Sequence, residues 1–392
     1  MSSHPVILAC RYGGWSHINE SFFKALRHEY PQHEWREFDY HKEVIQAHWG
    51  WRLRWLLEAG VVYRRRLARL LPKPGLLRYE WRDAALLTTQ SFKAGHRLAQ
   101  AKLRKLLNGQ PATLVIQTGS RYSARLPECP HFIYTDHTHL TNLQYPAFDR
   151  SQLNCQGWID CEREMYRSAS GLLTMSDNVR RSALQDYGVP AEKCITVGAG
   201  FNASPDASEK SADRDWTRKE ILFVGTEWDR KGGPWLLRSF QELRKIHPDA
   251  TLTVVGCHPK IHEANVDVVG FVPLQQVRSY MERATVFCLP TRQEPFGIVF
   301  LEAMAFGMPV VASQNGALPE IVGHGSTGLL VPDNDVGALT AALKSLLDSP
   351  QLSATMGAAG RERAYGYHQW RQVADRTKQA LDALSHHTAT PI

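Results

Sequence analysis

The sequence predicts an α/β protein made of two units, each a parallel β-sheet with helices packed on both faces. Short runs that are nearly continuous in Val, Ile and Leu alternate with helical patterns along the chain, and such runs are typical of parallel strands covered on both sides. A length of 392 residues favours two domains over one. A hydrophobic fraction of 43% is enough for two cores, which excludes wholesale disorder and a fibrous repeat.

The predicted strands fall into two groups. In the first half of the chain the apolar runs are Pro5–Cys10, Thr113–Thr118, His131–Thr135, Gly171–Met175 and Lys193–Val197. In the second half they are Ile221–Val224, Thr251–Val255, Val266–Val269, Val286–Leu289, Pro309–Ala312 and Gly328–Val331. Helical patterns stand between them, for example Pro234–Ile246, Leu274–Ala284 and Val336–Leu347. Strands that alternate with helices in this way predict parallel sheets.

A polar segment separates the two groups of strands. Ala203–Lys219 is rich in Ser and Asp and lacks periodicity, which is typical of a linker. We therefore predict an N-terminal domain over residues 1–203, a linker over 204–219 and a C-terminal domain over 220–365. A last helical pattern, over 366–385, follows the second group of strands, and we expect this helix to cross back to the first domain.

Three features bear on the compartment. No apolar run approaches the roughly 18 residues that a membrane-spanning helix needs. The first apolar run has no basic region before it and stops after Cys10, so we do not expect a secretory signal. The seven cysteines are spread out without a C-x-x-C pair, which favours buried thiols over a disulfide framework or a zinc site. We expect a cytoplasmic protein.

Positive charge is concentrated in one segment. Residues 49–105 carry 14 Lys and Arg and 3 Asp and Glu, a local net charge of +11, whereas the whole chain carries +7. Within this segment, Trp49–Leu71 has apolar residues at helical spacing and arginines on another face. This pattern is typical of helices on anionic membrane surfaces, and also of an ordinary helix packed on its own domain. Both readings stay open, and without a recognised motif we expect no nucleic-acid partner.

The stretch 289–307 carries the most chemical information. A loop that contains Glu294 and Gly297 leads into Ile298–Phe306, which is apolar on every side except at Glu302. A helix that is apolar all round is buried, and a carboxylate on it must accept hydrogen bonds to be stable there. Gly297 allows a ligand to approach the backbone closely, and the free amides of a helix start favour an anion.

The order of these features predicts a ligand with three parts. Two carboxylates flank a set of amides, which suits sugar hydroxyls at one end, a diphosphate in the middle and a ribose at the other end. The structural alternative is that Glu302 pairs with a core arginine and Glu294 is a solvated loop residue. A basic loop, Asp229-Arg-Lys-Gly232, also follows a strand, and we expect it to face the same crevice. A plain surface Arg-Lys pair is the alternative for that loop.

Residues from Val224 to about Arg363 resemble the donor domain of glycosyltransferase family 4, retaining enzymes of the GT-B fold. The motifs that carry the resemblance are Glu294-x7-Glu302 within EPFGIVFLEAMAFGMPVVAS, the Asp229-Arg-Lys-Gly232 loop and NGALPEIVGHGSTGLLVPDND. The first half matches only in outline, through Gly13-Gly14, a His after a strand, and Ser176…Val197-x-x-Gly200. The resemblance implies two Rossmann-like domains whose parallel sheets face a cleft.

The resemblance also implies roles for individual residues. Glu294 would hold the hydroxyls of the donor sugar, and Glu302 would hold the ribose. Lys231 would stabilise the leaving phosphate, and His137 would lie near the reacting carbon. The other donor-binding positions are the amides around Phe296, Gly297 and Ile298, the loop glycine Gly14, and Thr226. The family usually has Arg where Thr226 stands, and we expect Arg230 to supply that charge. It commonly has Asp where this chain has Asn202.

Three other patterns suggest cofactors, and we expect none of them to bind one. The stretch YTDHTHL brings together Asp136, His137 and His139, but no fourth ligand follows at zinc spacing. Asp333-Asn-Asp335 precedes a helix, so we predict a helix cap there. Gly198-Ala-Gly200 is too short for a dinucleotide fingerprint. We expect no obligatory metal and no nicotinamide cofactor.

We therefore expect a retaining hexosyltransferase that moves a sugar from a nucleotide-diphosphate donor to an acceptor held mainly by the first domain. The segment 49–105 favours a lipid-linked or cell-surface glycan as acceptor, and hence polysaccharide biosynthesis at the inner face of a membrane. Three alternatives stay open: a nucleotide-sugar epimerase on the same fold, a non-catalytic sugar-nucleotide-binding protein, and a phosphorylase with a pyridoxal cofactor. For the last, no Schiff-base lysine is identifiable in the sequence.

Overall fold

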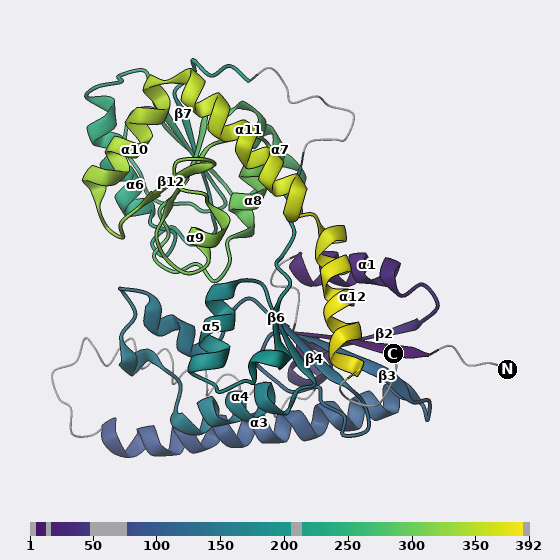
Figure 1. The fold of residues 1–392 in the computed structure, drawn as a ribbon. Helices are drawn as coiled ribbons and strands as arrows, with labels where there is room; N and C mark the ends of the chain where they lie inside the picture. The colour runs from purple at the N-terminus through teal and green to yellow at the C-terminus, as the bar shows by residue number, and fades with distance from the viewer. Residues whose placement is uncertain (1–4, 13–16, 48–76, 205–213, 387–392) are drawn as a thin grey trace.

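The computed structural model describes residues 5–12, 17–47, 77–204 and 214–386, and over 77–91 the backbone alone. These residues form two α/β domains, each with a six-stranded parallel sheet (Figure 1). The predicted fold class is therefore confirmed. Gly14 and the predicted amphipathic helix Trp49–Leu71 lie outside the described residues.

The N-terminal sheet has the strand order β2-β1-β3-β4-β5-β6, and all its pairs are parallel. Its strands are β1 (Val6–Arg11), β2 (Glu34–Asp39), β3 (Ala112–Thr118), β4 (His131–Thr135), β5 (Gly171–Thr174) and β6 (Cys194–Thr196). The central strand β1 is buried on both sides. Ile7 and Ala9 belong to one core cluster and Val6, Leu8 and Cys10 to another, which is the alternation that a strand between two helical layers requires.

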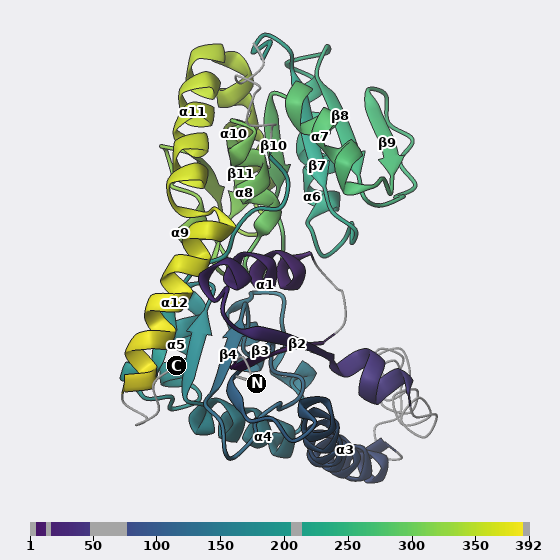
Figure 2. The same ribbon diagram turned by 90° about the vertical axis from the view of Figure 1, so that its right-hand side faces the viewer.

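Helices cover both faces of this sheet. They are α1 (Ile18–Glu29), α3 (Leu77–Leu107), α4 (Gln156–Ser168) and α5 (Asp177–Gln185). Helices α3 and α4 pack together on one face, while α1 packs with the C-terminal helix α12 (Trp370–His386) on the other (Figure 2). The core of the N-terminal domain is thus completed by the end of the chain.

The C-terminal sheet has the strand order β12-β11-β10-β7-β8-β9, again with every pair parallel. Its strands are β7 (Glu220–Val224), β8 (Thr251–Val255), β9 (Val266–Gly270), β10 (Val286–Leu289), β11 (Val310–Ser313) and β12 (Gly328–Val331). Its helices are α6 (Gly233–Arg244), α7 (Leu274–Arg283), α8 (Ile298–Ala305), α9 (Leu318–Ile321), α10 (Val336–Asp348) and α11 (Pro350–Tyr367). The strand order reverses between β7 and β10, and ligands of open parallel sheets bind at such a reversal.

The chain returns to the N-terminal domain after α11. Helix α11 packs on α8, and α12 packs on α1 and β5. At the turn between them, the Nδ1 atom of His368 lies 3.1 Å from the carbonyl oxygen of Ala199. A side chain on Gly200 would collide with Trp370. The two passages of the chain between the domains are therefore packed directly against each other.

Two features of the fold depart from the sequence prediction. Strand β2 was not predicted, because its residues Glu34, Arg36 and Glu37 are polar and it lies at the edge of the sheet, where only one side is paired. The long helix α3 spans 31 residues and contains the second half of the basic segment 49–105, where no helix was predicted. No described helix combines the length and the apolar character that a membrane span requires.

Candidate functional site

Three loops of the C-terminal domain meet where its strand order reverses. They follow β7, β10 and β11, and glycines allow them to touch backbone to backbone. Gly232 has φ +76°, and a Cβ there would overlap the carbonyl oxygen of Pro290. Gly316 has φ +55°, and a Cβ there would overlap the carbonyl oxygen of Glu294. Because neither position has room for a side chain, the loop that carries Glu294 is held between the other two.

Hydrogen bonds behind this loop fix its path. Thr291 is fully buried, and its carbonyl oxygen accepts hydrogen bonds from the Ser313 hydroxyl and, at 2.7 Å, from the Asn315 side-chain amide. The backbone amide of Arg292 donates to the carbonyl oxygen of Arg230 at 2.9 Å. The three loops therefore form one preorganised unit that positions Glu294.

Glu294 and Lys231 form an ion pair in this unit. The Lys231 ammonium donates to Glu294 Oε2, and their side chains are only 12% and 8% exposed. Glu294 is thus not a solvated loop residue, which excludes the structural alternative for this position. In such a pair the carboxylate can accept hydrogen bonds from hydroxyl groups, and the adjacent ammonium can bind an anion.

The N-terminus of α8 lies directly after Glu294. Gly297 adopts φ +102° and caps the helix, Ile298 is partly exposed, and the buried Phe296 directs its ring toward His368. The first amides of a helix have no partners within the helix, and the helix dipole favours an anion there. The tip of α8, Lys231 and Glu294 thus place an anion site next to a hydroxyl-binding carboxylate.

Glu302, on the second turn of α8, has a different environment. It is 7% exposed, and its Oε1 accepts hydrogen bonds from the backbone amides of Asn202 and Ala203, each at 3.3 Å. Both amides belong to the chain passage between the domains. Burial raises the pKa of Glu302 to about 7, although these two hydrogen bonds oppose the shift. The partner of Glu302 is therefore the interdomain backbone and not a core arginine.

Arg230, which we expected to supply the charge missing at Thr226, is held by hydrogen bonds within the C-terminal domain. Its Nε donates to Glu227 at 2.6 Å and its Nη1 to the carbonyl oxygen of Gln293 at 2.8 Å. Burial raises the pKa of Tyr145, and the positive charge of Arg230 partly opposes this shift. Thr226 is exposed on the same loop. Arg230 therefore adds positive potential near the cleft while its guanidinium supports the loop that carries Glu294.

The N-terminal domain contributes a facing wall. His137, just after β4, has its ring nearly parallel to that of Tyr145, with centroids 6.2 Å apart. Burial lowers the pKa of His137 to about 4, so its imidazole is neutral near neutral pH. Burial, together with Glu294, raises the pKa of Asp136. Glu294 and Lys231 of one domain thus lie near Asp136, His137 and Tyr145 of the other. No role in binding was predicted for Asp136 and Tyr145.

A second contact joins the two domains beside this site. Glu320, on α9, accepts hydrogen bonds from the backbone amides of Asp177 and Asn178, at 2.7 Å and 2.6 Å. These amides begin α5 of the N-terminal domain, where a negative charge is stabilised by the helix dipole. Arg181 of the same helix lies 3.4 Å from the carboxylate. Glu320 therefore caps a helix of the opposite domain.

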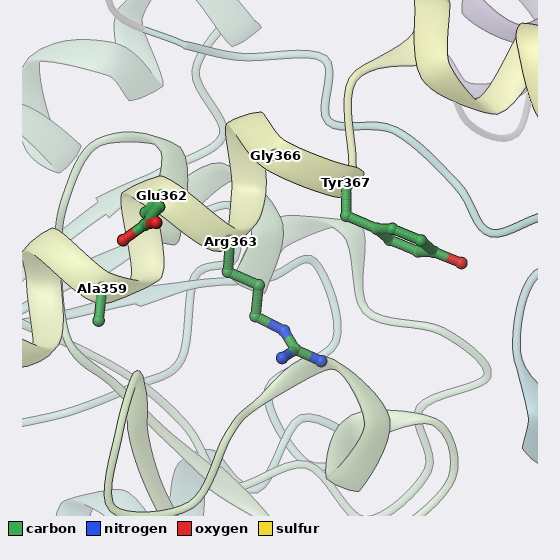
Figure 3. Close-up of a pocket in the computed structure, with 5 residues that line it drawn as sticks. All are labelled: Ala359, Glu362, Arg363, Gly366 and Tyr367. Carbon is green, nitrogen blue, oxygen red and sulfur yellow. The ribbon is translucent and has the colours of Figure 1, made fainter.

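Other candidate sites give no comparable cluster. Among the described residues, no group of three or more His, Cys, Asp or Glu side chains is placed to hold a metal ion. The Asp335 side chain accepts from the amide of Ala338, which confirms the predicted cap of α10. A hollow on α11, shown in Figure 3, contains none of the predicted site residues. Its lining is Ala359, Glu362, Arg363, Gly366 and Tyr367.

Two sheets of this topology facing one cleft define the GT-B fold. Solved structures with the same fold include WaaG, a glycosyltransferase involved in lipopolysaccharide biosynthesis, with a TM-score of 0.61 and 15% identity over 94% of this chain and 98% of that one. Anabaena Alr3699/HepE in complex with UDP has a TM-score of 0.61 and 16% identity over 96% and 99% of the two chains. At these identities the likeness shows the fold alone.

The family match falls in the C-terminal domain. Residues 218–349 match the family model for glycosyl transferases group 1. A GDP-mannose-dependent alpha-(1-6)-phosphatidylinositol monomannoside mannosyltransferase of Mycolicibacterium smegmatis is 34% identical over 46% of this chain and 53% of its own length. An alpha-maltose-1-phosphate synthase of the same organism is 30% identical over 58% and 66%. The chain thus spans about half to two-thirds of the length of these curated relatives.

Proposed function

We propose that the protein is a glycosyltransferase that moves a hexose from a nucleoside diphosphate sugar to a hydroxyl group of an acceptor. The observation that carries the proposal is the contact of Glu294 with Lys231 beside the N-terminus of α8. It joins a hydroxyl-binding carboxylate, a phosphate-binding cation and a set of helix-start amides. The family match over 218–349 includes all three and supports the same assignment.

In this proposal the donor lies along the first two turns of α8. The diphosphate contacts the amides around Gly297 and Ile298 and the ammonium of Lys231. Glu294 accepts hydrogen bonds from the sugar hydroxyls. Both hydrogen bonds that Glu302 receives from described residues go to Oε1, so Oε2 is the oxygen that binds the ribose.

The reaction breaks the bond between the anomeric carbon and the leaving phosphate oxygen and forms a bond from that carbon to the acceptor oxygen. Lys231 and the N-terminus of α8 stabilise the charge that develops on the phosphate. The family that the chain resembles retains the configuration of the sugar. Because Glu294 is paired with Lys231 and does not serve as a nucleophile, retention in this proposal comes from attack of the acceptor on the face that the phosphate leaves. The acceptor proton passes to the departing phosphate. His137, being neutral, contacts the sugar near the reacting carbon without adding charge.

The names of the relatives support a hexose donor and a glycan or glycolipid acceptor. One relative is a GDP-mannose-dependent enzyme named for a phosphatidylinositol mannoside, and another is a synthase of maltose 1-phosphate. We extend the proposal to an acceptor held mainly by the N-terminal domain, in a cytoplasmic protein whose basic segment 49–105 contacts an anionic membrane surface. No metal or other cofactor takes part in the proposed step.

The test is a screen of UDP-glucose and GDP-mannose for thermal stabilisation, followed by release of nucleoside diphosphate with and without glycolipid acceptors. A ligand that binds the native protein raises its melting temperature. We expect stabilisation by one donor and diphosphate release that increases with acceptor. Isomerised donor formed without acceptor would instead identify an epimerase, and stabilisation without turnover would identify a binding protein. No stabilisation by either donor would contradict the proposed site.

A further inference from the structure

One buried hydroxyl group in the cleft has no partner. Tyr145 follows the short 3-10 helix His139–Gln144 and is 2% exposed. Its hydroxyl makes no hydrogen bond with any residue that the structure describes. Leaving a buried polar group unpaired costs about 1–3 kcal/mol, and most buried hydroxyls are paired. Such a group at a domain interface therefore indicates a place for a ligand atom.

The position of this hydroxyl is fixed from both domains. It lies 3.2 Å from the point that a Cβ on Gly316 would occupy, in the loop after β11. The ring below it is nearly parallel to that of His137. Burial raises the pKa of Tyr145, and the charge of Glu294 acts in the same direction. The hydroxyl is therefore protonated near neutral pH and close to the carboxylate that we assign to the sugar.

Two further unpaired polar atoms belong to the same surroundings. His137 Nδ1 and Asn315 Oδ1 are buried and likewise lack a hydrogen bond within the part of the chain that the structure describes. Asn315 directly precedes Gly316, and its side-chain nitrogen is already used by the carbonyl oxygen of Thr291. A phenol, an imidazole nitrogen and an amide oxygen are thus left without described partners where the two domains meet.

The chemistry of this group selects its ligand. A phenol both donates and accepts hydrogen bonds, and a carboxylate or an amide oxygen only accepts. Sugar hydroxyls also do both, so one hydroxyl can donate to a carboxylate while it accepts from a phenol. A phosphate does not fit here, because the carboxyl groups of Glu294 and Asp136 lie close enough to influence each other and would repel it. The phosphate belongs at Lys231 and the tip of α8.

We propose that Tyr145, from the N-terminal domain, donates a hydrogen bond to a hydroxyl of the donor sugar that Glu294 holds from the C-terminal domain. This inference rests on the proposed function and adds a sugar-selecting residue to it. The nucleoside diphosphate alone does not reach Tyr145. The tyrosine therefore discriminates a nucleotide sugar from its nucleotide product, and it does so only when the two domains face each other closely.

The experiment compares Tyr145→Phe with the wild-type protein by isothermal titration with UDP-glucose and UDP, and with GDP-mannose and GDP. The substitution removes one oxygen and keeps the ring beside His137. The matched control is Tyr30→Phe, which also removes a buried hydroxyl without a partner, away from the cleft. Losing one hydrogen bond should weaken binding of the nucleotide sugar by about three- to tenfold and leave the diphosphate within about twofold. Tyr30→Phe should change neither affinity.

The outcomes separate the two proposals. If the wild-type protein binds neither nucleotide sugar nor diphosphate, the proposed function fails, and this inference fails with it. If the wild type binds and Tyr145→Phe binds the sugar nucleotide equally well, only the role of Tyr145 is overturned. An equal loss for sugar nucleotide and diphosphate would also overturn it, because the tyrosine would then support the site as a whole. A melting temperature close to that of the wild type establishes that the variant is folded.

Discussion

Glu294 and Glu302 stand on either side of the first turn of α8, and they are almost equally buried, at 6% and 7% exposure. Their partners differ. Glu294 binds the ammonium group of Lys231, whereas Glu302 accepts hydrogen bonds from two backbone amides of the interdomain passage. One carboxylate has a full counter-charge from the loop after β7, whereas the described partners of the other are two peptide amides.

The difference shows that the partner, more than the depth of burial, determines whether a buried carboxylate stays charged near neutral pH. The ammonium of Lys231 balances the charge of Glu294, so Glu294 is available as an anionic acceptor for hydroxyl groups. Among the residues that the structure describes, no cation contributes to the environment of Glu302, and burial raises its pKa to about 7. Glu302 therefore changes its charge near neutral pH, at the point where the two domains are joined.

The largest effect is expected for Glu294→Gln. Loss of the carboxylate removes the acceptor for the donor sugar and leaves the Lys231 ammonium without its partner. We expect transfer activity, measured as diphosphate release, to fall by about 100- to 1000-fold, while the protein remains folded. Glu263→Gln is the control, because it breaks a partly buried ion pair with Arg244 elsewhere in the domain. Equal losses in the two variants would contradict a specific role for Glu294.

A smaller effect, on stability, is expected for Glu302→Gln. The folded-state pKa of about 7 lies above the ordinary glutamate pKa of 4.5, so the native protein binds a proton more tightly than the unfolded chain. The stabilisation by this group is complete below pH 4.5 and is lost as the pH rises through 7. Glutamine resembles the protonated acid. We therefore expect the variant to match the wild type at pH 5 and to exceed it at pH 8, by up to about 3 kcal/mol.

Melting temperatures of both proteins at the two pH values test this prediction. Glu220→Gln serves as the comparison, because Glu220 is a buried carboxylate that has Arg283 as a cationic partner at 2.8 Å. Its substitution should lower the melting temperature slightly at both pH values, since the ion pair with the largely exposed Arg283 is lost at either pH. If Glu302→Gln also lowers the melting temperature equally at pH 5 and pH 8, the claim that Glu302 is destabilised by its charge in the folded state is contradicted.

The smallest effect is expected for Glu320→Ala. The variant loses the interdomain cap on α5, which is worth about 1 kcal/mol at a helix N-terminus. We expect the ligand-free protein to open, seen as a larger radius of gyration in small-angle X-ray scattering. Ser176→Ala is the matched control, because Ser176 caps the same helix from within its own domain. Opening of both variants to the same extent would show that α5, and not the contact between domains, is responsible.

The sheets and one side of the site could be predicted from the sequence. A strand such as β10 is a run of apolar residues between turns, so its burial on both faces is visible in the sequence. Glu294 and Lys231 both follow strand ends, and the rule for open parallel sheets brings such loops together. The edge strand β2 could not be recognised in this way, because its polar residues give no continuous apolar run.

The rest of the site depends on contacts between distant parts of the chain. The amides that Glu302 binds lie about 100 residues earlier, and backbone donors have no sequence signature. Tyr145 lies in the N-terminal domain, where no motif distinguishes it from other tyrosines. It becomes a candidate site residue because its hydroxyl lies close to Gly316 of the opposite domain. Asp136 was visible beside His137, but its electrostatic coupling to Glu294 required the arrangement of both domains.

The most direct test is a crystal structure of the protein with UDP-glucose or GDP-mannose, whichever binds. We expect the diphosphate at the first turn of α8 and at Lys231, with the hexose between Glu294 and Tyr145 and its hydroxyls within hydrogen-bonding distance of both side chains. A nucleotide sugar bound away from the α8 tip, or a hexose that contacts neither Glu294 nor Tyr145, would contradict it.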